Sequence, residues 1–289
     1  MSANAAQLDG QLAAFMAALE RELKAGEISL PSWSKVTERA RNALAAPTFN
    51  VDELARLLGA EAGLAVRVLT LANSAMFMRG GRPLSDLKLA ILRIGHDMLR
   101  SAVYAHALLQ LRQAPRLQRL RSTLQQLWRE GTQVAALARL IATRTGQGDP
   151  DAALLAGLLH NIGKLYLYVR LDDGGAQPQN APMSIELLTA WHARIGASIA
   201  RNWQMPEALC QAVADQDVMP EAGGAHSELA AVLSVAVIGA NAASDPAQLP
   251  DTAAHLAEFT HYGLDAASWL ELLARAQAES TALRVTFGD

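Results

Sequence analysis

Hydrophobic positions recur at spacings of three and four residues along most of this chain. That period places apolar side chains on one face of an α-helix. Ala and Leu dominate the apolar residues and β-branched runs are scarce, which favours helix over strand. The predicted helices cover residues 8–23, 34–44, 51–58, 61–73, 84–94, 98–111, 117–145, 183–203, 227–243 and 264–283. The pattern therefore predicts an all-α protein with an N-terminal and a C-terminal helical bundle.

Residues 149–164 combine a well-marked helix start with an unusual helix end. Asp149 is suited to cap the first turn and Pro150 to occupy the first helical position. Pairs of leucines one turn apart predict a buried helix, and Gly157 among them would let another backbone come close. His160 and Asn161 follow at once. A His-Asn pair at the inner end of a buried helix indicates either a site or the remnant of one.

Other segments refine this outline. Gly95 separates the segments 84–94 and 98–111, and residues 227–243 are almost wholly apolar, which predicts a central buried helix. Residues 164–169 alternate Tyr with Leu and Val, a strand-like period. Asn73 and Ser74 fit a helix C-terminus whose amide side chain satisfies free carbonyls, and Ser85-Asp86 fits a helix start.

Composition restricts the location and the partners. The 289 residues carry a net charge of −3 and the pI is about 6.2, so bulk charge predicts no DNA partner and no attraction to anionic lipid. Cys210 is the single cysteine, which excludes an intramolecular disulfide. The first residues do not read as a signal peptide, and no apolar run approaches the roughly 18 residues of a membrane span. We expect a soluble cytoplasmic protein without a membrane partner.

Four arginines surround Pro115. Arg112, Arg116 and Arg119 have spacings that would put them on one helical face, and Arg121 follows. The simpler interpretation is a solvated face, since charge runs usually have that role. The functional interpretation is a contact patch for an acidic partner or for the phosphate of a nucleotide.

Several strings together resemble the HDOD domain family. They are Leu30-Pro31, a helix from Val51 onward, Leu69-Thr-Leu-Ala-Asn-Ser74 and Ala90-Ile-Leu-Arg-Ile-Gly95. The family usually has Asp-Pro ahead of its fourth helix, where this chain has Glu61-Ala62. The resemblance runs from about residue 30 to 241 and implies a helix at 164–169. We expect an N-terminal helix at 1–29, an N-terminal helical subdomain at 30–115 and an HD-like helical subdomain at 116–289.

The second half resembles the HD superfamily of metal-dependent phosphohydrolases, to which HDOD domains are related. Enzymes of that superfamily bind metal through a first His, a His-Asp pair and a distant Asp, often with further histidines. The matching positions here are Glu130, His160-Asn161, His192 and Asn241, and a later His-His segment matches Ala214-Asp-Gln-Asp217. The amides of Asn161 and Asn241 are neutral, whereas a divalent metal prefers carboxylates. We therefore expect no bound metal and no cofactor. We expect the two histidines to be structural and to tie neighbouring helices together, since a buried imidazole can donate from one nitrogen and accept at the other.

The resemblance implies a non-catalytic HDOD module that acts through protein–protein interaction in bacterial signal transduction, with an unidentified signalling protein as partner. One alternative is a divergent metal-dependent phosphohydrolase acting on a nucleotide or other phosphoester, with Glu130, His160 and His192 as ligands. Another is a sensor that binds a cyclic dinucleotide or another nucleotide without turnover through the arginines around Pro115. Cys210 has apolar neighbours, so we expect it to pack rather than react.

Overall fold

The computed structural model describes residues 2–28, 34–45, 49–78, 81–173, 183–218, 227–244, 264 and 266–287. Helices are the only regular elements in those ranges, so the all-α prediction is confirmed. They are α1 (Ser2–Ala25), α2 (Lys35–Ala45), α3 (Val51–Gly59), α4 (Ala62–Ala72), α5 (Ala75–Met78), α6 (Leu87–Arg112), the 3₁₀ helix η1 (Pro115–Leu120), α7 (Arg121–Thr145), α8 (Pro150–Leu159), α9 (Ile162–Asp173), α10 (Met183–Asn202), α11 (Glu207–Ala214), α12 (Glu228–Ser244) and α14 (Ala266–Phe287).

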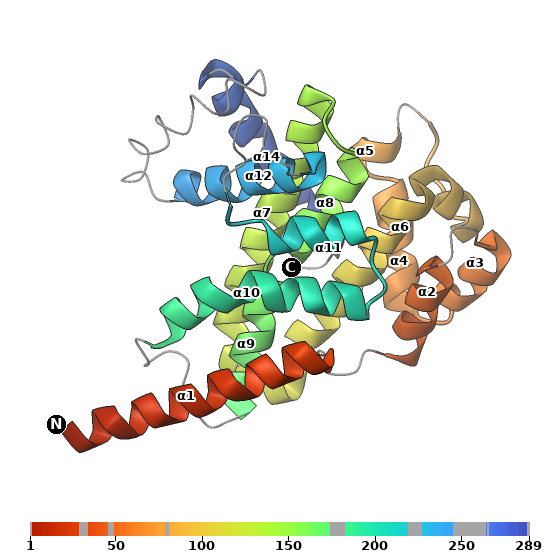
Figure 1. Ribbon diagram of the computed structural model, residues 1–289. Helices are drawn as coiled ribbons and strands as arrows, with labels where there is room; N and C mark the ends of the chain where they lie inside the picture. Colours follow the sequence, from red (N-terminus) through yellow and green to blue (C-terminus); the bar gives the residue numbers. More distant parts are fainter. Residues whose placement is uncertain are drawn as a thin grey trace.

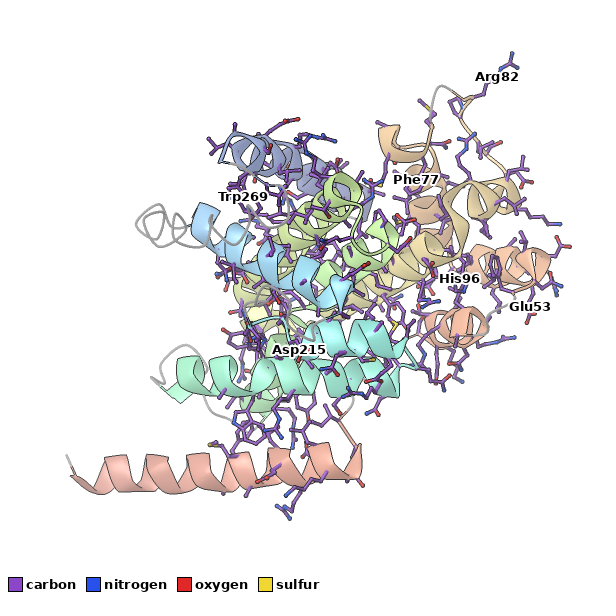
Figure 2. The ribbon with its side chains drawn as sticks, turned by 45° about the horizontal axis from the view of Figure 1, so that its top comes forward. Glu53, Phe77, Arg82, His96, Asp215 and Trp269 are labelled. Atoms are coloured by element: carbon purple, nitrogen blue, oxygen red, sulfur yellow. The ribbon has the colours of Figure 1, made fainter. Side chains whose placement is uncertain are left out.

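The helices form two neighbouring groups (Figure 1). Helices α2, α3 and α4 pack on the long helix α6. Helix α7 is the centre of the second group and packs against α8, α12 and α14, while α10 joins α9 to α11. Helix α6 also contacts α8, so the two groups share one continuous core. Figure 2 shows Trp269 of α14 lying toward α12, where its ring packs on Gly239.

Helix α1 lies along the outside of the second group (Figure 1). Its C-terminal part is anchored, since Glu22 accepts hydrogen bonds from Tyr166 Oη at 2.6 Å and from Arg170. The residues just after α1 are held as well. Asn202 Nδ2, at the end of α10, donates to the carbonyl oxygens of Gly26 at 2.9 Å and Ile28 at 2.7 Å. These contacts fix the connection that leads from α1 toward α2.

Helix α6 behaves as the sequence predicts at its break and differs at its start. Gly95 has φ 77°, a left-handed value that suits glycine, and it breaks the helix between the two predicted segments. The helix begins at Leu87 rather than at residue 84, because Asp86 caps it by accepting from Leu89 N at 2.9 Å. Asn73 binds not its own helix end but Leu84, with Nδ2 2.8 Å from the carbonyl oxygen and Oδ1 2.7 Å from the amide nitrogen.

The prediction of one helix over residues 117–145 is wrong at its beginning. Pro115 starts the separate 3₁₀ helix η1, in which Leu117 departs from helical geometry at φ −100° and ψ 16°. Proline fits the first position of a helix but cannot continue one from before it. The connection between α6 and α7 is therefore a 3₁₀ helix, and α7 begins only at Arg121.

Residues 149–173 begin as predicted. Asp149 accepts hydrogen bonds from Asp151 N at 3.0 Å and Ala152 N at 2.7 Å, and Pro150 takes the first helical position. A Cβ on Gly157 would lie 2.4 Å from the Cα of Ala135, so the missing side chain lets the backbones of α7 and α8 come close together here, as predicted. Residues 164–169 belong to α9, which confirms the helix that the family resemblance implies.

The expectation that no apolar run approaches the length of a membrane span is wrong for Pro150–Asp172, which contains an 18-residue window with a mean hydropathy of 1.3. Of that window, 83% is buried inside the protein, and the stretch consists of two helices that meet at His160-Asn161. Such burial is typical of a core segment. Helix α12, the predicted central helix, is also buried over most of its described length and packs on α7, α8 and α11.

Candidate functional site

Four of the positions that the sequence singles out line one cavity. Glu130 of α7, His160 at the end of α8, His192 of α10 and Asn241 of α12 border a space of about 40 Å³. Asn161 is not among the residues that line this cavity and instead lines a separate, mostly apolar pocket between α6, α7, α8 and α9. Residues about 110 positions apart thus meet because α8 and α12 both pack on α7.

The carboxylate of Glu130 is already satisfied by two amides. Gln126 Nε2 donates to Oε1 at 2.9 Å, and Asn161 Nδ2 donates to Oε2 at 3.3 Å. The carboxamide of Asn161 supplies the N–H that a carboxylate at this position would lack. A second carboxylate here would instead place two negative charges together in a buried setting, which is unfavourable without a cation between them.

His160 is neutral and bound to its own helix. Its Nδ1 donates to the carbonyl oxygen of Gly157 at 2.6 Å, which leaves Nε2 as an acceptor. Burial lowers the pKa of His160 to about 3, and the nearby charge of Lys164 acts in the same direction, while the Gly157 bond opposes them. The expectation that this ring joins two helices is wrong, because its hydrogen bond is within one turn. The backbone carbonyl of His160 makes the link instead by accepting from Gln216 Nε2 at 3.1 Å.

His192 does join two elements, as expected. Its Nε2 lies 2.9 Å from Oδ2 of Asp217, which follows α11. Burial raises the pKa of Asp217, but the hydrogen bond to His192 and the charges of His192 and Lys164 outweigh it, and the pKa is lowered overall. The pair therefore ties α10 to the segment after α11 through a carboxylate that stays charged near neutral pH.

Sequence reasoning did not single out Lys164, which lines the same cavity. Its positive charge lowers the pKa of both His160 and Asp217. The available signal was its position four residues after His160, a spacing typical of neighbours on a helical surface. The cavity therefore already contains a protein cation beside its carboxylates.

The donor set does not fit the divalent metal that the HD resemblance implies. Both oxygens of Glu130 accept from amides, and His192 is bound to Asp217. Across the residues that the structure describes, no three His, Cys, Asp or Glu side chains form a group that could hold a metal ion. Three buried atoms of this region have no hydrogen-bond partner among the described residues: Asn161 Oδ1, Gln216 Oε1 and His192 Nδ1. The two amide oxygens are neutral and suit a hydrogen-bond donor such as water, and the single imidazole nitrogen adds no negative charge for a divalent metal.

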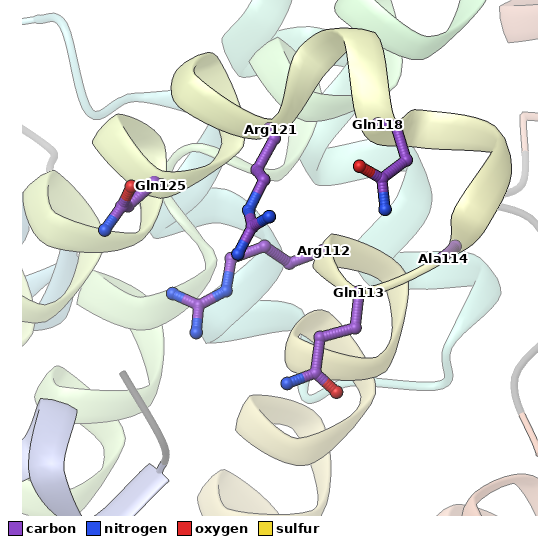
Figure 3. A pocket seen from close by; sticks show the side chains of 6 residues that line it. All are labelled: Arg112, Gln113, Ala114, Gln118, Arg121 and Gln125. Atoms are coloured by element: carbon purple, nitrogen blue, oxygen red, sulfur yellow. The ribbon is translucent and has the colours of Figure 1, made fainter.

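The arginines around Pro115 do not share one face. Arg112 ends α6, Arg116 and Arg119 lie in η1, and Arg121 begins α7. The predicted common face of the first three is wrong because Pro115 separates the helices and η1 has a different period. Arg112 and Arg121 instead border a pocket of about 320 Å³, and Arg116 and Arg119 are not among its lining residues (Figure 3).

A second polar cluster, which sequence reasoning missed, surrounds Glu61. Its carboxylate accepts hydrogen bonds from Ser34 Oγ at 2.8 Å, from Gln110 and from His106 Nε2 at 2.7 Å. Burial raises the pKa of Glu61, but these hydrogen bonds outweigh it and lower the pKa overall. Arg67 Nε donates to His106 Nδ1 at 3.1 Å, which extends the cluster. The signal in the sequence was Glu61 itself, which departs from the family's Asp-Pro.

Cys210 packs as expected. It is completely buried, and burial raises the pKa of its thiol to about 11, so the thiol stays protonated near neutral pH. The motif residues Leu30-Pro31 lie outside the described residues.

The model of the HDOD domain family matches residues 30–219. The match covers well over half of the chain, so the chain belongs to the HDOD domain family. An uncharacterized protein from Treponema pallidum (strain Nichols) is 26% identical over 217 residues, which are 70% of this chain. The chain spans about 40% of the length of that relative.

Solved structures share the fold. A Shewanella amazonensis SB2B protein, named as a proposed metal-dependent phosphohydrolase, is 21% identical with a TM-score of 0.72 over 94% of this chain and 99% of its own. An HDOD domain protein from Geobacter sulfurreducens is 24% identical with a TM-score of 0.53, over 76% of this chain and 78% of its own. A Marinobacter aquaeolei VT8 protein, named as a proposed signal transduction protein, is 22% identical with a TM-score of 0.60, over 94% of this chain and 61% of its own.

Proposed function

We propose that this chain is a regulatory HDOD module that works without phosphoester hydrolysis and acts by binding a separate signalling protein. The observation that carries the proposal is that Glu130 accepts from the neutral amides of Gln126 and Asn161, so that an amide stands where a metal site would have a second carboxylate. A hydrolytic metal ion needs anionic ligands that are free to bind it. The pairing of His192 with Asp217 and the charge of Lys164 support the same conclusion. The Marinobacter protein's name adds support for a signalling role at the level of the fold.

The competing function is a divergent metal-dependent phosphohydrolase. It is favoured by the fold shared with the Shewanella protein and by the gathering of Glu130, His160 and His192 around one cavity. Metal content of the purified protein, measured by mass spectrometry after incubation with Mn²⁺, and hydrolysis of bis(p-nitrophenyl) phosphate decide between the two. We expect well under one metal ion per chain and no turnover. Stoichiometric metal together with turnover that both His160→Ala and His160→Gln abolish would establish the enzyme instead.

The protein-binding part of the proposal is supported by an open groove of about 750 Å³. It lies between the end of α4 with α5 on one side and α14 on the other. Val66 and Val285 line it and are 61% and 73% exposed. Exposed apolar side chains that lie together in a groove are typical of interaction sites. We assign the contact with the signalling partner to this groove.

Two variants of α14 test that assignment. Val285→Asp places a charge in the groove, and Leu270→Asp places the same charge on an equally exposed apolar position outside it. In affinity capture from the source cell, we expect a partner that binds the native protein and Leu270→Asp but not Val285→Asp. Equal capture by all three proteins would exclude the groove as the contact.

A further inference from the structure

We infer that the pocket between the end of α6 and the start of α7 binds a phosphate-bearing small molecule of about mononucleotide size. The pocket measures about 320 Å³ and is lined by Arg112, Gln113, Ala114, Gln118, Arg121 and Gln125. Figure 3 shows these side chains arranged around one space, with those of Arg112 and Arg121 close together at its centre. The inference stands apart from the cavity at His160, so it holds whether or not that cavity is catalytic.

The lining has the chemistry of an anion site. It contains two guanidinium groups and three carboxamides, and the described residues that line it include no carboxylate. Arginine presents a planar fork of donors that matches the oxygens of a phosphate. Arg121 makes no hydrogen bond or ion pair with another described residue, so its donors are available to a ligand.

The position of Arg112 is supported by an aromatic ring. Its guanidinium carbon lies 5.6 Å from the centroid of the Trp128 ring of α7, a cation–π contact. The charge of Arg112 also reaches Arg67, whose pKa is lowered first by burial and then by Arg112. Positive charge is therefore concentrated on this side of the junction between α6 and α7.

The volume of the pocket and its three carboxamides limit the class of ligand that it can bind. Ligand pockets measure about 300–1,000 Å³, so this one lies at the lower end of the range. A mononucleotide suits such a space better than a cyclic dinucleotide, which carries two bases and two phosphates. Each glutamine offers both a donor and an acceptor, as recognition of a base or a sugar requires. Arg121 would bind the phosphate, Arg112 would add positive charge beside it, and the glutamines would contact the remainder.

Calorimetric titration of the full chain with AMP, GMP, cyclic di-GMP and inorganic phosphate tests the inference. We expect AMP or GMP to bind one site more tightly than phosphate does. Arg121→Ala should weaken that binding about tenfold or more, as loss of one charge-assisted hydrogen bond predicts. Arg112→Gln should weaken it as well, and circular dichroism confirms that each variant folds.

Matched controls separate the pocket from bulk charge. Arg116→Ala and Arg119→Ala remove the same charge from exposed positions of η1 that do not line the pocket, and both should bind as the native protein does. His160→Gln should also leave binding unchanged. Absence of heat with AMP and GMP, equal weakening by the η1 variants, or tighter binding of cyclic di-GMP than of either mononucleotide would overturn the inference.

Discussion

Replacing His160 by Gln should remove a large part of the acid sensitivity of folding. The His160 ring is buried, and its pKa is lowered to about 3 from an ordinary 6.5. The unfolded chain therefore takes up a proton near pH 6.5 that the folded chain does not accept until about pH 3. Stability is fully present above the unfolded pKa and is lost as pH falls through this window. At about 1.4 kcal/mol per pKa unit, His160 alone should cost about 2 kcal/mol between about pH 8 and about pH 5.

Urea denaturation of the native protein and of His160→Gln at these two pH values measures the effect. At pH 8, His160→Gln should be less stable than the native protein, because glutamine packs less well at this position. Between pH 8 and pH 5, however, the free energy of unfolding of the variant should fall by about 2 kcal/mol less than that of the native protein. His96→Gln is the control, since the side chain of His96 is 22% exposed to solvent. An equal pH-dependent loss in the native protein and His160→Gln would refute the reasoning, as would an NMR titration of the His160 ring near pH 6.5.

Three further substitutions test the packing and the polar clusters by chemical denaturation. Gly163→Ala should destabilise by about 3 kcal/mol or more, because its Cβ would lie 1.8 Å from the carbonyl oxygen of His192; Gly59→Ala, which meets one side-chain atom at 3.9 Å, should change stability by less than about 1 kcal/mol. Asn161→Asp should cost about 2 kcal/mol or more at neutral pH and less as pH falls, since protonation neutralises the new carboxyl; an unchanged melting temperature would contradict this. Glu61→Gln should cost about 1–3 kcal/mol by weakening its bonds from His106 and Gln110 of α6 and from Ser34, and no loss would show that these bonds do not stabilise the fold.

The sequence predicted the helices well because they depend on local signals. The period of the leucines in 154–159, the cap at Asp149 and the break at Gly95 are properties of neighbouring residues, and the structure agrees with each. The connection between α6 and α7 was harder. Pro115 indicated a break in the helix. Whether the chain then continues as an α-helix or as a 3₁₀ helix depends on how Leu117 and Leu120 are buried against the rest of the protein.

The sequence predicted which residues form the candidate site but not which of them pair by hydrogen bonds. The family resemblance supplied Glu130, His160, His192 and Asn241, and the structure places them around one cavity. Which groups pair there depends on distances between helices far apart in sequence, so the bonds of Asn161 to Glu130 and of His192 to Asp217 were not readable from spacing. The cluster at Glu61 could not be predicted for the same reason, because its partners come from α6 and from Ser34, which are far from Glu61 in the sequence.

The cavity at His160 explains how the helices around it can pack without a metal ion. In a metal site, the cation offsets the mutual repulsion of the carboxylates and orders the histidines. Here the amide of Asn161 donates to Glu130, and the imidazole of His192 and the charge of Lys164 stabilise the ionised carboxylate of Asp217. His160 needs no counterion because it is neutral. Both carboxylates therefore have a partner within the protein, and the amide at position 161 supplies a donor where a carboxylate would add a second negative charge beside Glu130.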